Sequence, residues 1–146
     1  MRRLVMGATI AVANHVAIAR AGDEAPSLDL GRAVYEQHCA SCHGANAEGA
    51  PNWQERDAHG ELPAPPHNAE GHMWRHSDAD LYQMVEKGWR DPFNKTQRLT
   101  MPAFGDVLSR EQIRAVITYL KTLWTDEQRQ FQSEESQGHP FPSEAQ

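Results

Sequence analysis

The sequence predicts a helical fold, and three observations support this prediction. Near the C-terminus, apolar residues recur at the spacing of one helix face, namely Ile113, Val116, Ile117, Leu120 and Trp124. Leu30 and Val34 give a shorter stripe of the same period near the start of the chain. No segment resembles alternating strands, so the remainder is expected to be loop.

The helices are expected to begin at recognisable capping residues. Ser27 and Asp29 are both suitable N-caps for a first helix that runs towards Cys39. Ser77 precedes an acidic first turn and an apolar stripe that ends before Gly88, which predicts a short middle helix. Ser109 followed by Gln112 predicts a capping box at the start of the final helix, which should pack against the first.

The connecting segment 44–76 is rich in glycine and proline and has no sustained periodicity, which predicts an ordered loop. A loop of this length needs something to wrap around, so we expect it to surround a bound group. A second loop is expected over 89–106, which contains Pro92 and Pro102.

The two ends of the chain carry different signals. Basic residues, an apolar run and small residues before Gly22 predict a secretory signal peptide over residues 1–21, which places the protein in the periplasm. An uncleaved leader that anchors the protein remains an alternative. One domain is expected over 27–124. Residues 125–146 are predicted to be a short helix or a disordered polar tail, with any helix reaching Phe131 and disorder from Ser133 onwards.

Charge narrows the range of partners. Without residues 1–21 the chain has eleven basic and twenty acidic residues, a net charge of −9. Nucleic acid is therefore not an expected partner. An acidic carrier is expected to dock on a basic patch of another protein, and to meet a membrane only through such partners or through an uncleaved leader.

The most informative motif is the C-x-x-C-H segment from Cys39 to His43, which contains both cysteines of the chain. Two thiols at this spacing can each form a thioether with a haem, and the adjacent imidazole can ligate its iron. A thioredoxin-like dithiol or half of a zinc site would use the same cysteines. The adjacent histidine, and the lack of a second ligand pair, argue against both alternatives.

A second axial ligand is expected from a thioether, because soft sulfur stabilises ferrous iron. Met101 is the candidate, since it lies in a loop before the final helix and is followed by the stiff Pro102. Met73 is the rival methionine. Three histidines also compete as ligands, or could with Met73 form a copper or zinc site, namely His67, His72 and His76. The simpler interpretation as loop histidines is favoured, because His72 and His76 are not expected to share a helix face.

This order of elements and motifs resembles the monohaem class I c-type cytochromes over roughly Leu28 to Trp124. The resemblance implies an all-α small cytochrome c fold, with three to four helices and long loops wrapped around one covalent haem c. It also implies ligation by His43 and Met101, and electron transfer.

The same resemblance assigns further residues. Contacts that lock the first and last helices are expected from Gly31, Tyr35, Val116 and Tyr119. Pro51 is expected to accept a hydrogen bond from the His43 imidazole through its carbonyl group.

The segment around Trp74 departs from the family pattern. Trp74, Trp89 and Phe104 are expected to shield the haem edges, and Trp74 could also donate a hydrogen bond to a propionate. Arg75 or Arg90 could form an ion pair with the same group.

The sequence thus predicts a periplasmic one-electron carrier, not an enzyme, working with an oxidase, reductase or dehydrogenase. Three alternatives remain at this point. The haem could have a displaceable sixth ligand, as in a haem enzyme or a gas or peroxide sensor. The chain could be the cytochrome subunit of a larger redox complex, or it could handle a metal through His67, His72 and His76.

Overall fold

The computed structural model describes residues 27–143, and this part of the chain is all-α, as predicted. Its elements are α1 (Leu28–His38), α2 (Ala40–His43), the 3-10 helix η1 (Met73–Arg75), α3 (Asp78–Lys87), α4 (Arg110–Lys121) and α5 (Asp126–Ser136). The predicted signal peptide, residues 1–21, lies outside the described residues. No helix within 27–143 is long and apolar enough to cross a membrane.

The predicted helix starts are confirmed by their capping hydrogen bonds. The hydroxyl groups of Ser27, Ser77 and Ser109 each accept a hydrogen bond from the backbone N–H three residues further along. At α4 the Gln112 side chain also accepts a hydrogen bond from the Ser109 N–H at 2.8 Å, which completes the capping box. Local sequence therefore determines where α1, α3 and α4 begin.

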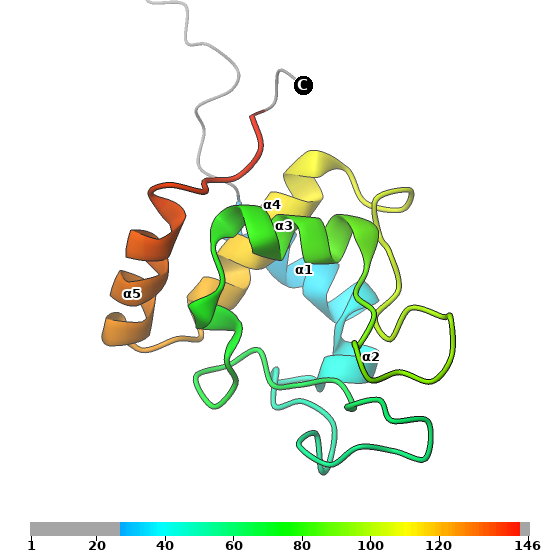
Figure 1. Cartoon of the computed structure of the whole chain (residues 1–146). Coiled ribbons are helices and arrows are strands. Elements are labelled where there is room, and N and C mark those ends of the chain that lie inside the picture. Colours follow the sequence, from blue (N-terminus) through cyan, green and yellow to red (C-terminus); the bar gives the residue numbers. More distant parts are fainter. Residues whose placement is uncertain (1–26, 144–146) are drawn as a thin grey trace, which may run out of the picture.

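The crossing of α1 and α4 forms the centre of the core. A Cβ atom added to Gly31 would lie 2.1 Å from the carbonyl oxygen of Ala115, so only glycine allows the helices to approach this closely. Beside this contact the rings of Tyr35 and Tyr119 lie 5.9 Å apart, and Val116 is buried. The expected lock between the first and last helices is confirmed, with Ala115 as an additional member. Helix α3 packs against α4 of this pair (Figure 1).

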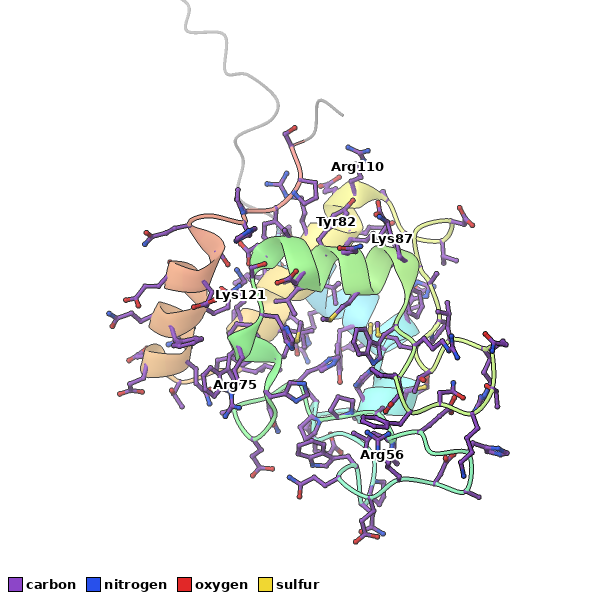
Figure 2. The ribbon with its side chains drawn as sticks, viewed as in Figure 1. Arg56, Arg75, Tyr82, Lys87, Arg110 and Lys121 are labelled. Atoms are coloured by element: carbon purple, nitrogen blue, oxygen red, sulfur yellow. The ribbon has the colours of Figure 1, made fainter. Side chains whose placement is uncertain are left out.

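Helix α5 extends further than the sequence analysis predicted. The helix was expected to reach Phe131 and to give way to a disordered tail from Ser133, but it continues to Ser136. The reason is tertiary: Gln132 is only 2% exposed, and its amide nitrogen donates to Asp78 at 2.6 Å and to Ser136 at 2.9 Å. Lys121 of α4, labelled in Figure 2, pairs with the same Asp78 carboxylate. Residues 144–146 lie outside the described part.

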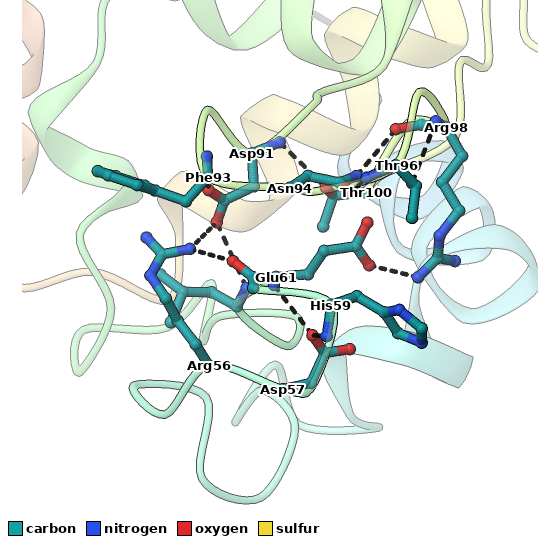
Figure 3. Close-up of polar contacts among 12 residues, drawn as sticks. Arg56, Asp57, His59, Glu61, Asp91, Phe93, Asn94, Thr96, Arg98 and Thr100 are labelled. Atoms are coloured by element: carbon teal, nitrogen blue, oxygen red, sulfur yellow. Dashed lines mark hydrogen bonds and ion pairs between the residues drawn. The ribbon is translucent and has the colours of Figure 1, made fainter.

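Two long loops, 44–72 and 88–109, contact each other directly (Figure 3). Arg56 of the first loop forms an ion pair with the buried Asp91 of the second at 2.8 Å, and Arg98 of the second pairs with the buried Glu61 of the first. The Lys95 N–H also donates to the first loop, to the carbonyl group of residue 59 at 3.0 Å. The loops were expected to wrap around a bound group, and the structure adds that they are also joined to each other.

Candidate functional site

The C-x-x-C-H motif lies where α1 gives way to α2. Cys39 caps α2, and its N–H donates to the carbonyl oxygen of Tyr35 at 2.9 Å, so the motif continues directly from α1. The Tyr35 hydroxyl donates to the carbonyl oxygen of Gly44 at 2.7 Å and thereby holds the far end of α2. Both thiols are free, with Cys39 partly buried and Cys42 exposed. The core of the protein therefore fixes the backbone that carries both thiols.

The environment of Cys39 argues against thiol redox chemistry. Burial, with a smaller contribution from Cys42, raises the pKa of the Cys39 thiol to about 11. Cysteines that serve as attacking thiolates have a lowered pKa, from nearby positive charge or a helix N-terminus. Cys39 is therefore not placed as the attacking thiol of a thioredoxin-like dithiol.

His43 is held in a single orientation by the backbone of the first loop. Its Nδ1 atom lies 2.9 Å from the carbonyl oxygen of Pro65, and the side chain is buried. A carbonyl oxygen can only accept, so Nδ1 must carry the proton and Nε2 keeps its lone pair. Burial lowers the pKa of His43, against a smaller opposing effect of the Pro65 carbonyl, so the neutral form that ligates metals is favoured.

The assignment of this hydrogen bond to Pro51 was wrong. Pro51 is exposed, and Pro65 occupies the accepting position. The chain reaches it because the segment 64–68 runs back along the residues after α2: Ala50 N–H donates to the Ala64 carbonyl oxygen at 2.8 Å, and His67 N–H donates to that of Ala47 at 2.9 Å. Pro51 is nearer to His43 in the sequence, whereas the fold of the loop brings Pro65 closer to it in space.

His67 lies directly against His43. The two imidazole rings are stacked, with centroids 3.8 Å apart and planes inclined by 25°. Two imidazoles on opposite sides of one iron atom would have their ligating nitrogens about 4 Å apart, given metal–nitrogen distances of about 2 Å, and their ring centres further still. The two stacked rings are therefore too close together for His43 and His67 to be the two ligands on opposite sides of one iron atom.

Met101 lies in the second loop, and its backbone is fixed by the other arm of that loop. Trp89 and Met101 form an antiparallel bridge, with N–H to carbonyl oxygen distances of 3.0 and 2.9 Å. The rival Met73 is 8% exposed and belongs to the hydrophobic core, so packing accounts for it. Between these two methionines, Met101 is the one that packing leaves available as a ligand.

The roles suggested for Trp74 and Arg75 find no support. The Trp74 indole N–H donates to the carbonyl oxygen of Gly71 at 3.0 Å, a hydrogen bond that a contact to a propionate would have to replace. The ring of Trp74 packs edge-on against Phe131 of α5 at 5.5 Å, and the Arg75 guanidinium lies over it at 4.8 Å. Figure 2 shows Arg75 beside η1. These side chains attach α5 to η1.

The three loop histidines do not form a metal site. The rings of His72 and His76 flank η1 and lie 5.6 Å apart, whereas His67 is stacked on His43. In residues 27–143 no group of three or more His, Cys, Asp or Glu side chains is arranged to hold a metal ion. The copper or zinc alternative for the His67, His72 and His76 loop is therefore contradicted within the described residues.

The donor set of the site fits a haem c. Two free thiols and a neutral imidazole with its Nε2 unclaimed lie on one rigid turn, which is what two thioethers and an axial bond require. Beside them the Nδ1 atom of His67 is buried and has no hydrogen-bond partner among the described residues, an orphaned polar atom of the kind expected next to a site for a bound group.

The sequence model of the family "Cytochrome c" matches residues 28–124. The chain belongs to this family. Members carry covalently bound haem c, for which Cys39 and Cys42 are the two cysteines of the motif, and membership indicates a role in electron transfer.

Related proteins support this membership. The chain is 28% identical over 98 residues to the cbb3-type cytochrome c oxidase subunit FixP of Sinorhizobium medicae, covering 66% of this chain and 30% of the relative. It is 30% identical over 98 residues to the subunit CcoP of Azospirillum brasilense, covering 64% of this chain and 30% of that one. The chain thus spans less than a third of the length of these relatives.

Among solved structures, cytochrome cL from Methylophaga aminisulfidivorans aligns with a TM-score of 0.50 at 16% identity, covering 82% of this chain and 69% of that protein. This likeness supports the fold alone.

Proposed function

We propose that this cytochrome is an exported one-electron carrier, in which Cys39 and Cys42 hold haem c and His43 and Met101 are the axial ligands. The hydrogen bond between His43 Nδ1 and the Pro65 carbonyl oxygen carries the proposal, because it leaves Nε2 free to ligate and strengthens its donor character. The bound haem supplies a site that gains and loses one electron. The predicted signal peptide over 1–21 supports export, as does the attachment of haem c outside the cytoplasm.

The residues around the site restrain both ligands in ways that suit this role. Pro65 holds the His43 ring, and the Trp89 bridge holds the backbone of Met101. Two ligands on restrained backbone change position little when the charge on the iron changes, which favours rapid electron transfer. Filled axial positions also keep water and small ligands from the iron.

The test is the optical spectrum of the oxidised holoprotein, in which sulfur ligation gives a weak red charge-transfer band. We expect the band in the wild-type protein and in Met73→Leu, and its loss in Met101→Ala. A wild-type protein without the band, or a Met101→Ala variant that keeps it, would exclude Met101 as the ligand. Tight carbon monoxide binding by the folded ferrous wild type would favour the haem enzyme or sensor alternative.

The comparisons favour one refinement, namely that the partner is a respiratory oxidase. The relatives that match this chain are named as subunits of cbb3-type oxidases, and the match covers 30% of their length. We infer that this domain either delivers electrons to such an oxidase or works as a subunit of a larger redox complex. Affinity purification of the full chain from its own host separates the two: a stoichiometric complex indicates a subunit, and a free monohaem protein indicates a diffusible carrier.

A further inference from the structure

We propose that His67 is a positioning residue for His43, holding its imidazole in one rotational orientation by stacking on its face. This inference rests on the proposed role of His43 as an iron ligand. Its basis is the parallel contact between the two rings, 3.8 Å between centroids and 25° between planes.

The stacking contact matters because the single hydrogen bond to Pro65 does not prevent the His43 ring from rotating. The bond from Nδ1 to the Pro65 carbonyl oxygen fixes where that atom of the His43 ring lies, but the ring plane can still tilt about the bond. A flat ring packed against one face of His43 opposes that tilt. Pro65 and His67 therefore restrain different motions of the same imidazole, and both belong to the segment Pro65-Pro66-His67.

His67 is itself held firmly enough to act as a support. Its N–H donates to the Ala47 carbonyl oxygen at 2.9 Å, and its own carbonyl oxygen accepts from the Trp124 indole N–H at 2.9 Å. Pro66, the residue before it, is fully buried. The backbone of His67 is thus fixed on one side to the loop after α2 and on the other to the end of α4.

The identity of the residue supports a specific use. The Nδ1 atom of His67 is buried without a hydrogen-bond partner in the described residues, and such an atom costs free energy that an aliphatic side chain would not. An aliphatic side chain would fill the space but would offer no planar face to His43. Stacking is the contact that the histidine provides and a leucine would not.

The experiment compares proton NMR spectra of the oxidised holoproteins, because the paramagnetic shifts of the haem methyl groups depend on the orientation of the axial imidazole plane. The variants are His67→Leu, which removes the planar ring, and His67→Phe, which keeps one. The control is His59→Leu, the same substitution at an exposed loop position. We expect His67→Leu to change the order or spread of the methyl shifts, and His67→Phe and His59→Leu to preserve the wild-type pattern.

The proposal is overturned if His67→Leu keeps the wild-type pattern, or if His67→Phe departs from it as far as His67→Leu does. Should His67→Leu fail to fold, His67→Gln removes the aromatic face while keeping a polar side chain, and the same comparison is read from it. A separate variant, His43→Ala, tests the proposed function itself. If its spectrum is the same as that of the wild type, His43 is not a ligand, and both proposals are overturned.

Discussion

The α1–α4 pair and the two long loops are held together by different kinds of contact. The helices meet through apolar side chains and one very close backbone approach at Gly31. The loops meet through ion pairs and hydrogen bonds between residues far apart in the chain, such as Arg56 with Asp91 and Arg98 with Glu61. The two proposed ligands depend on these contacts differently: His43 lies in α2, next to α1, and its ring is held by the first loop, whereas Met101 lies in the second loop.

The comparison suggests that a change in the helix pair should unfold the whole domain, whereas a change between the loops should act locally. A packed helix crossing cannot open without exposing the core to water. A loop contact can open while the helices stay packed, because sub-global openings cost less than global unfolding.

The largest effect is expected from Gly31→Ala. The new Cβ would lie 2.1 Å from the Ala115 carbonyl oxygen, and backbone cannot move aside as a flexible side chain does. We expect a loss of about 3 kcal/mol or more in the free energy of unfolding, measured by denaturant titration of the holoprotein. Gly138→Ala is the matched control, since nothing lies within 4 Å of its added Cβ. Equal stability of the two variants would mean that the helices do not cross this closely.

A smaller and local effect is expected from Asp91→Ala. The carboxylate accepts hydrogen bonds from Arg56 at 2.8 Å and from the Phe93 N–H at 2.8 Å, and removing it breaks the ion pair and leaves the Phe93 N–H without its acceptor. We expect a cost of about 1–3 kcal/mol. Hydrogen exchange should show the lost protection in loops 44–72 and 88–109 and little change in α1 and α4. Asp106→Ala, at an exposed position of the second loop, should change neither.

The same carboxylate predicts how the loops respond to acid. Burial opposes ionisation of Asp91, but hydrogen bonds from the Phe93 N–H, Arg56 and the Leu62 N–H outweigh it, so its pKa lies below the usual value. A lowered folded-state pKa gives stability that is present above the unfolded pKa of about 4 and is lost as the pH falls through the folded value.

We therefore expect hydrogen-exchange protection of the loops to fall below about pH 4, and to fall less steeply in Asp91→Asn. The protection of the Asp91→Asn loops should still depend on pH to some extent, because backbone hydrogen bonds also lower the pKa of Asp57 in the first loop. An identical acid response in wild type and Asp91→Asn would show that this carboxylate contributes nothing.

The smallest effect is expected from Trp124→Phe, which probes the link between the helices and the first loop. It removes the hydrogen bond from the indole N–H to the His67 carbonyl oxygen at 2.9 Å but keeps an aromatic ring in the core. The expected cost is about 1 kcal/mol in the free energy of unfolding. Trp53→Phe is the control, since the indole N–H of Trp53, in the first loop, makes no hydrogen bond within residues 27–143. A cost no larger than the control's would mean that the loop does not depend on α4.

The difference between the two regions also explains what could be predicted from sequence. Helix starts at Ser27, Ser77 and Ser109 depend on residues three positions apart, so their signals are local and the predictions were correct. The position where α5 ends depends on the hydrogen bond from Gln132 to Asp78. The residue that accepts the hydrogen bond from His43 depends on how the first loop folds back. Neither has a local signal, which is why the tail and Pro51 were predicted wrongly.

For the site, the motif residues Cys39, Cys42 and His43 could be found from spacing alone. The motif does not reveal that His67 is stacked on His43; the sequence marked His67 only as a competing ligand or a loop histidine. The contact between the loops was missed for the same reason, because Arg56 and Asp91 are separated along the chain and carry no mutual pattern.

The bridge between Trp89 and Met101 has a consequence for how this protein can diverge or be redesigned. Both of its hydrogen bonds are made by main-chain atoms, so the placement of the methionine does not depend on which side chain position 89 carries. The Trp89 side chain is 44% exposed. The residue at position 89 can therefore be substituted to suit a new partner without moving the backbone of Met101. Proline is the exception, because it lacks the N–H that position 89 contributes to the bridge.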